Sequence, residues 1–181
     1  ITFRSQSGNA GDVTLFTSSS AIFFIKLNKT DFITFSDLTF NDFNSISTQR
    51  SRIFLQGNCD NVKFTGNVFK GGINGAGISG AGVSLSNFIV DSNNFNIKSG
   101  IYIFDPTGKC SNTLILNNSF NCQFGISIYK IDGLILQKNN INCTSPVNPH
   151  GYSTYFSDCR GNISITKNKL VSTSPNDRST D

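Results

Sequence analysis

An eight-residue segment, Leu134-Ile-Leu-Gln-Lys-Asn-Asn-Ile141, decides the fold, because versions of it recur along the whole chain. In each version the first and third residues are apolar, apart from Thr113, and an apolar residue closes the segment. The closing residues lie 21 to 29 positions apart, a spacing that is typical of one turn of a solenoid. The other versions are Ile33–Phe40, Val62–Phe69, Phe88–Phe95, Thr113–Phe120 and Ile163–Leu170.

The alternation of apolar and polar residues within each segment predicts a short strand with one buried face. A polar pair and a bend follow, and then a second short strand, which is clearest in Gly100-Ile-Tyr-Ile-Phe104 and Gly125-Ile-Ser-Ile-Tyr129. Strands of one coil stacked on those of the next make a parallel β-helix. We expect about seven coils over residues 1–171 and a polar tail over residues 172–181, as a piece of a longer protein.

The composition favours the same fold. All 11 acidic residues are Asp, and Met and Trp are absent, so many good helix formers are missing. Residues that suit a pleated sheet, such as Ile, Val, Phe and Thr, are abundant. A helical bundle and a doubly wound α/β fold are therefore excluded, and the chain is expected to be all-β.

The charge pattern limits the partners. The net charge is +4, but the 15 Lys and Arg residues are scattered singly, so we expect no nucleic-acid partner. Only 14% of residues are charged, yet the chain has no long apolar run, and we expect one soluble domain without a membrane span.

The sixth residue of the segment is asparagine in every version but the first, where it is Leu38. Asparagine tolerates the left-handed backbone of a sharp corner. Its amide can also donate to and accept from identical neighbours about 4.8 Å away in a stacked column. We predict that these residues form a structural asparagine ladder: Asn67, Asn93, Asn118, Asn139 and Asn168.

Stacked copies of apolar-x-apolar-x-x-Asn-x-apolar resemble the right-handed parallel β-helix of the pectin-lyase-like superfamily. The opening residues Ile1-Thr-Phe-Arg-Ser-Gln-Ser-Gly8, followed by Phe32–Phe40, are similar to β-helix segments of secreted Bacteroidetes surface proteins. The resemblance covers residues 1 to about 170 and implies a right-handed solenoid. It implies no single activity, because the superfamily includes lyases, hydrolases, epimerases, phage tailspikes and non-catalytic adhesins.

Because five is an odd number, at least one cysteine is free or pairs with another chain. Cys122 and Cys143 each lie two residues beyond the closing apolar residue in consecutive coils. Stacked residues there are about 5 Å apart, a spacing that allows a disulfide. The alternative is that both are buried thiols that act as small core residues.

Catalytic signatures are weak in this sequence. The pectin hydrolases of the superfamily carry an Asn-Thr-Asp, an Asp-Asp, a Gly-His-Gly and an Arg-x-Lys motif, and the sequence contains none of them. Asp31 and Asp60 could share a calcium ion, but further oxygen ligands are not evident, so we predict no metal site and no cofactor. Their regular position before each segment favours a turn-forming role.

One surface feature suits a ligand. If Ile101, Ile103, Ile126 and Ile128 point inward, Phe104 and Tyr129 point outward, and aligning Gly100, Gly125 and Gly151 adds Tyr155 to the same column. Aromatic faces on a rigid sheet suit sugar rings. The alternative is an aromatic ladder that only stabilises the sheet. Polar and aromatic neighbours complete the candidate carbohydrate site: Tyr102, Asp105, Lys130 and the loop residue His150.

These features lead us to expect a non-catalytic, extracellular β-helix segment of an adhesin-like or surface protein, secreted or displayed at the cell surface, that binds polysaccharide. The alternative is a polysaccharide lyase or glycoside hydrolase of the superfamily that acts on plant or algal polysaccharide. The exposed strand edges of a solenoid predict neighbouring coils of a parent chain or self-association.

Overall fold

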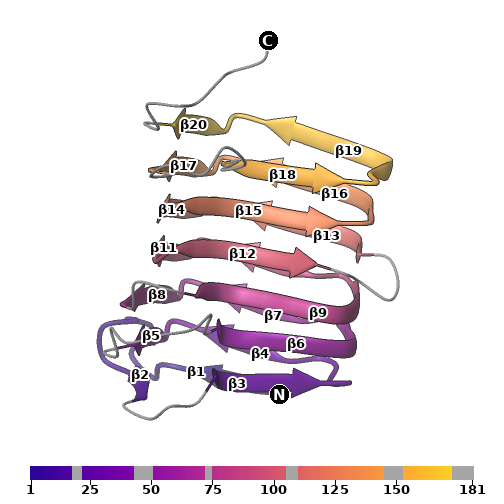
Figure 1. The fold of residues 1–181 in the computed structure, drawn as a ribbon. Helices are drawn as coiled ribbons and strands as arrows, with labels where there is room; N and C mark the ends of the chain where they lie inside the picture. The colour runs from indigo at the N-terminus through magenta and orange to yellow at the C-terminus, as the bar shows by residue number, and fades with distance from the viewer. Residues whose placement is uncertain (18–21, 43–50, 72–74, 105–109, 145–152, 173–181) are drawn as a thin grey trace.

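The computed structural model describes residues 1–17, 22–42, 51–71, 75–104, 110–144 and 153–172 of the 181-residue chain. Every regular element in these ranges is a β-strand, and all strand pairs are parallel. The strands wind upward from the N-terminus into a right-handed parallel β-helix (Figure 1). The predicted fold class is therefore confirmed.

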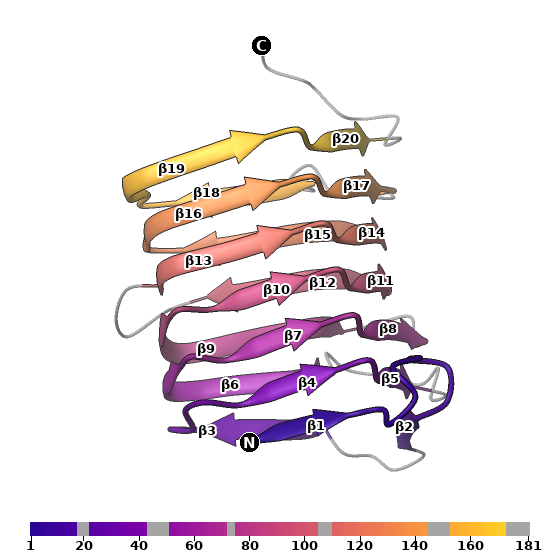
Figure 2. The ribbon, with the colours of Figure 1, turned by 180° about the vertical axis from the view of Figure 1, so that it is seen from behind.

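Each coil contributes a strand to each of three faces, which we call the first, second and third face. The strands come as six successive triplets followed by β19 and β20, slightly fewer complete coils than the seven expected. The first face, seen in Figure 2, carries the first half of the repeated segment. Its strands are β1 (Thr2–Arg4), β4 (Thr34–Ser36), β7 (Lys63–Thr65), β10 (Ile89–Asp91), β13 (Cys110–Leu116), β16 (Ile131–Gln137) and β19 (Arg160–Thr166).

The second and third faces complete the coil. The second face is a separate seven-stranded sheet of β2 (Thr14–Thr17), β5 (Thr39–Asp42), β8 (Val68–Gly71), β11 (Asn94–Asn96), β14 (Ser119–Cys122), β17 (Asn140–Cys143) and β20 (Lys169–Ser172). The third face consists of β3 (Phe23–Asn28), β6 (Ser51–Asp60), β9 (Ala76–Ser86), β12 (Ser99–Phe104), β15 (Phe124–Tyr129) and β18 (Thr154–Ser157). It joins the first face in one 13-stranded sheet, because the end of β9 pairs with β13.

The core is built from columns of identical or similar side chains. The closing residues Phe40, Phe69, Phe95 and Phe120 lie in register and are buried. Their rings stack with centroid distances of 5.0, 4.7 and 4.7 Å. The strand register thus stacks phenylalanine on phenylalanine in successive coils, and each ring shields the apolar faces of its neighbours from water.

The ladder asparagines form one continuous buried column. The backbone and side-chain amides of Asn93 both donate to Oδ1 of Asn118, at 2.8 and 3.1 Å. Asn118 donates in the same way to Oδ1 of Asn139, at 2.9 and 3.0 Å, and its Nδ2 also donates to the carbonyl of Val90 at 2.9 Å. The pattern extends from Leu38 to Asn168. It satisfies polar groups at a corner where the sheet's own hydrogen bonds stop.

The prediction that the ladder asparagines themselves turn the corner was wrong. The left-handed residue is the one before each of them, as in Ser92 with φ 57° and Asn117 with φ 55°. That residue bends the chain, and the next residue then points its amide into the interior. Residues as different as Gly66 and Lys138 occupy the left-handed position, so the conformation is set by the stacked coil and not by residue type.

The sequence analysis missed a second asparagine column, whose members are partly or fully exposed. Asn61, Asn87 and Asn112 lie at the corner between the third and first faces, with φ values of 55°, 52° and 49°. The side-chain amide of Asn87 donates to Asn61 at 3.0 Å, and that of Asn112 donates to Asn87 at 3.2 Å. Each residue precedes a ladder asparagine by six positions, a signal that could have revealed this column.

Of the two alternatives for Cys122 and Cys143, the structure has the buried thiols. The two residues are paired in register, as predicted, but both are buried free thiols. Cys122 donates to the carbonyl of Phe95 at 3.5 Å, and Cys143 donates to that of Ser153 at 3.9 Å. Both residues therefore act as small core residues.

We predict that Asn118→Ala destabilises the solenoid by about 3–5 kcal/mol, because it leaves the buried amides of Asn93 without their acceptor. Urea unfolding followed by circular dichroism measures this change. Asn121→Ala is the matched control, since Asn121 lies on the same coil but is exposed, and its contact with Asn96 is long at 3.4 Å. Equal losses of stability in the two variants would contradict a special role for the ladder.

Candidate functional site

Aromatic side chains project from the outer side of the third face. In β12, Ile101 and Ile103 are buried, so the alternate residues Tyr102 and Phe104 point outward and are 39% and 37% exposed. Their rings lie 5.1 Å apart with an interplanar angle of 27°. The pair is therefore held on a strand whose opposite side is anchored in the core.

A second aromatic pair lies on the two following strands. In β15, Ile126 and Ile128 are buried and Tyr129 points outward, 5.2 Å from the ring of Tyr155 in β18. Ile103 pairs with Ile128, and one step further along the same register places Phe104 beside Tyr129. Tyr102, Phe104, Tyr129 and Tyr155 thus form one outward group over three consecutive strands, which we call the aromatic surface.

The aromatic surface is a zigzag and not the single column that the sequence predicted. Tyr155 is paired with Ser127, and Tyr129 is paired with Ser157, so Tyr155 is displaced by two residues from the expected column. The alignment on Gly151 caused the error. The residue level with Gly125 is Ser153, whose carbonyl accepts hydrogen bonds from the amides of Gly125 and Ile126 at 3.1 Å.

The tyrosine hydroxyls lie close enough to influence one another. Burial raises the pKa of the Tyr129 phenol, and the nearby phenols of Tyr102 and Tyr155 raise that pKa further. Both tyrosines would carry the same negative charge as Tyr129 when ionised, which disfavours its ionisation. At neutral pH Tyr129 therefore presents an uncharged hydroxyl group that can donate and accept hydrogen bonds.

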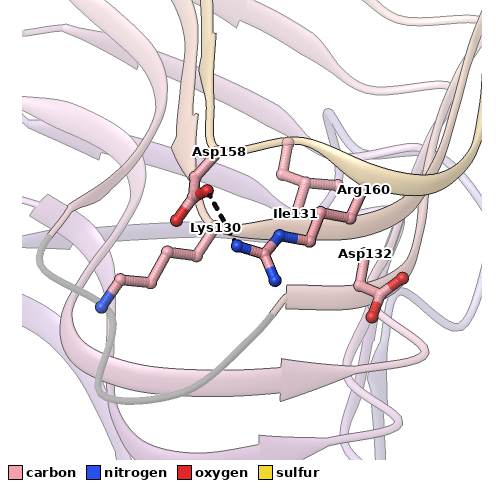
Figure 3. A pocket seen from close by; sticks show the side chains of 5 residues that line it. All are labelled: Lys130, Ile131, Asp132, Asp158 and Arg160. Atoms are coloured by element: carbon pink, nitrogen blue, oxygen red, sulfur yellow. Dashed lines mark ion pairs between the residues drawn. The ribbon is translucent and has the colours of Figure 1, made fainter.

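A small pocket adjoins the aromatic surface where the third face turns into the first. It is lined by Lys130, Ile131, Asp132, Asp158 and Arg160 and has a volume of about 130 Å³. Figure 3 shows these side chains. We call it the corner pocket. Lys130 and Asp158 turn the two stacked corners with φ values of 56° and 57°, and the Lys130 amide donates to the Ser157 carbonyl at 2.9 Å.

Two of the residues that line the corner pocket form an exposed ion pair. Arg160 Nη2 is 3.7 Å from Asp158 Oδ1, and the two side chains are 69% and 53% exposed. Solvent screens such a pair, so it contributes little to stability. Lys130 and Asp132 point away from this pair in Figure 3. The charges therefore surround the pocket and do not converge on one point, as an acid–base pair acting on one bond would.

The structure brings together only some of the predicted site residues. Phe104, Tyr129, Tyr155 and Tyr102 form the aromatic surface, and Lys130 lines the corner pocket beside it. Asp105 and His150 lie outside the described residues. The sequence analysis missed Asp158 as a site residue. Asp158 belongs to no repeated segment of the sequence. Only the pairing of Ser157 with Tyr129 in the structure places Asp158 beside Lys130.

The aspartates considered for calcium have another role. Asp31 Oδ1 accepts a hydrogen bond from the Asp60 amide at 2.8 Å, so it links two consecutive coils at a corner. In the described part of the chain, no group of three or more His, Cys, Asp or Glu side chains is arranged to hold a metal ion.

Comparisons with protein-family models, with curated proteins and with solved structures found no match to this chain. The fold and the site therefore define its class: a parallel β-solenoid with an outward aromatic surface and a charged corner pocket. Within the described ranges, no helix has the length and apolar character needed to cross a membrane.

The cysteines offer a test of this site's geometry. Cys159, between Asp158 and Arg160, is exposed, whereas burial raises the pKa of Cys110 to about 11 and that of Cys122 to about 12. We predict that one thiol reacts rapidly with Ellman's reagent at pH 8 in the folded protein, and that all five react after unfolding.

Partial burial and then the Asp158 carboxylate raise the pKa of the Cys159 thiol. Asp158→Asn removes the second cause and lowers that pKa, so more thiolate is present at pH 8 and the fast reaction should accelerate by about twofold. Cys159→Ser is the control and should abolish the fast phase. A fast phase that survives in Cys159→Ser would show that one of the buried thiols is accessible.

Proposed function

We propose that this chain is a non-catalytic, polysaccharide-binding β-helix segment of an extracellular adhesin-like or surface protein. The observation that carries the proposal is the aromatic surface: four outward rings on a rigid face, arranged as two pairs with centroid distances of 5.1 and 5.2 Å. Exposed apolar groups gathered on one side of a protein are typical of binding sites.

Aromatic rings suit sugars because each has a flat apolar face and, in tyrosine, a polar edge. The apolar faces can pack against the C–H groups of a sugar ring, while the tyrosine hydroxyls reach the sugar's own hydroxyls. Ser127 and Ser157, which are paired with Tyr155 and Tyr129, supply further hydroxyl groups between the rings. Since the strands already fix the backbone, a ligand would lose little affinity to ordering the protein.

The spacing of the rings also suits an extended chain. The aromatic surface covers β12, β15 and β18, whose mutual separation is about 4.8 Å per strand. A ligand that follows the coils upward therefore meets an aromatic group at each step. This arrangement favours a polymer of repeating rings over a compact small molecule.

The wider context of the proposal comes from the repeat itself. From the resemblance of its repeated segment we propose a relation to the pectin-lyase-like superfamily and to secreted Bacteroidetes surface proteins, and hence a secreted or cell-surface location. We further propose that the chain self-associates through its apolar residues at β19. Ile165 is 53% exposed there, whereas Leu136, its partner in the coil below, is 1% exposed.

Affinity electrophoresis through gels that contain a panel of neutral and acidic polysaccharides tests the proposal. We expect one polysaccharide to retard the chain. Tyr129→Ala and Tyr155→Ala should each weaken binding by about five- to tenfold, the loss expected for one stacking aromatic group. Phe32→Ala is the control, because Phe32 is an exposed aromatic residue at a corner away from the aromatic surface.

Each alternative has its own result in this assay. Cleared gel behind the protein band would favour the lyase or hydrolase. Absence of retardation across the panel, or an equal loss of binding in Phe32→Ala, would contradict polysaccharide binding at the aromatic surface.

A further inference from the structure

We propose that the corner pocket is a subsite for one neutral sugar unit of the polysaccharide that stacks on the aromatic surface. This inference rests on the proposed function, and it adds a ligand class and a second region of contact. It is carried by the position, the size and the charge balance of the pocket.

The corner pocket begins where the aromatic surface ends. Lys130 directly follows Tyr129 in the chain, and Asp158 directly follows Ser157, the strand partner of Tyr129. The left-handed corners at Lys130 and Asp158 then turn the backbone from the third face to the first. A ligand that leaves the rings of Tyr129 and Tyr155 in this direction meets Asp158 and Arg160 next.

The size of the corner pocket suits a single ring. Its volume is about 130 Å³, whereas sites that enclose a whole drug-sized ligand usually have about 300–1,000 Å³. The pocket can therefore hold one sugar unit, and the rest of the chain must lie on the open aromatic surface.

The charges of the corner pocket favour a ligand without net charge. Two cations, Lys130 and Arg160, lie around it together with two carboxylates, Asp132 and Asp158. The two carboxylates would repel an acidic sugar that approached the cations, and the two cations would repel a cationic sugar that approached the carboxylates. A neutral sugar meets neither conflict.

The ion pair of Arg160 and Asp158 has the chemistry to recognise sugar hydroxyls. The Arg160 guanidinium presents a planar set of N–H donors, and the Asp158 carboxylate is an acceptor, so neighbouring hydroxyls of one ring can accept from the first and donate to the second. The two groups are only 3.7 Å apart and are more than half exposed. Because an exposed pair of this kind is weak, rearranging it around a hydroxyl group costs little.

The test measures binding of soluble neutral polysaccharides, namely a β-glucan, a galactan and a mannan, and of polygalacturonate and alginate. The variants are Arg160→Ala and Asp158→Asn, with Lys167→Ala as the matched control because it removes an exposed cation from another corner of the last coil. We expect a neutral polysaccharide to bind with an affinity that changes less than about twofold between 20 and 500 mM NaCl. Arg160→Ala and Asp158→Asn should each weaken that binding about tenfold, and Lys167→Ala should leave it unchanged.

A second measurement needs no variant. Saturation with the bound polysaccharide should slow the reaction of Cys159 with Ellman's reagent at least threefold, because this exposed residue is the direct chain neighbour of Asp158 and Arg160, which line the pocket. A ligand confined to the aromatic surface would leave Cys159 as reactive as before.

The outcomes separate the two proposals. If Tyr129→Ala and Tyr155→Ala lose affinity while Arg160→Ala and Asp158→Asn bind like the unchanged chain, the aromatic surface binds and the corner subsite is overturned. A preference for polygalacturonate or alginate that salt abolishes would overturn the neutral ligand class and leave the aromatic surface in place. If no polysaccharide binds, both proposals fail.

Discussion

The whole structure depends on the in-register stacking of each coil on the one below it. Parallel hydrogen bonds fix the vertical step, and the buried asparagine column fixes the rotation of each coil, because an amide one residue out of place would lose both of its partners. Once the inward residues are fixed, the strand period of two fixes the outward ones as well. The aromatic surface is therefore a consequence of the core, since Tyr102 and Phe104 face outward because Ile101 and Ile103 face inward.

The first two faces could be predicted from the sequence because one short segment encodes both. Its first half forms the first face, its asparagine forms the corner, and its closing apolar residue lies in the second face, all within eight residues. Within this segment no connection of variable length separates the first face from the second. Equivalent positions of the segment in the sequence are therefore equivalent positions in the coils. The prediction for this corner was wrong by one position, because the left-handed residue is the one before the ladder asparagine. One residue turns the chain, and the next one fills the interior.

The third face could not be predicted as well, because the connection that leads to it varies. β14 and β15 are separated by one residue, whereas β17 ends at Cys143 and β18 begins only at Thr154. Gly151, which precedes β18, was therefore a poor guide to the strand register. The alignment on it placed Tyr155 beside Tyr129, two positions away from its partner Ser127. The corner pocket was harder still to predict. It combines the ends and beginnings of strands from two coils, and Asp158 and Arg160 belong to no repeated motif.

The location of the site follows from how support is distributed along a solenoid. On the third face, β12 is paired with β9 and β15, and β15 is paired with β12 and β18. Tyr102, Phe104 and Tyr129 thus lie on strands that are held from both sides. These strands can orient a ligand, while the exposed and weakly paired side chains of Asp158 and Arg160 at the corner can adjust to the ligand's hydroxyl groups. This division between a fixed apolar platform and an adaptable polar end is what a polymer of sugar rings requires, because its rings are alike in shape and differ mainly in their hydroxyls.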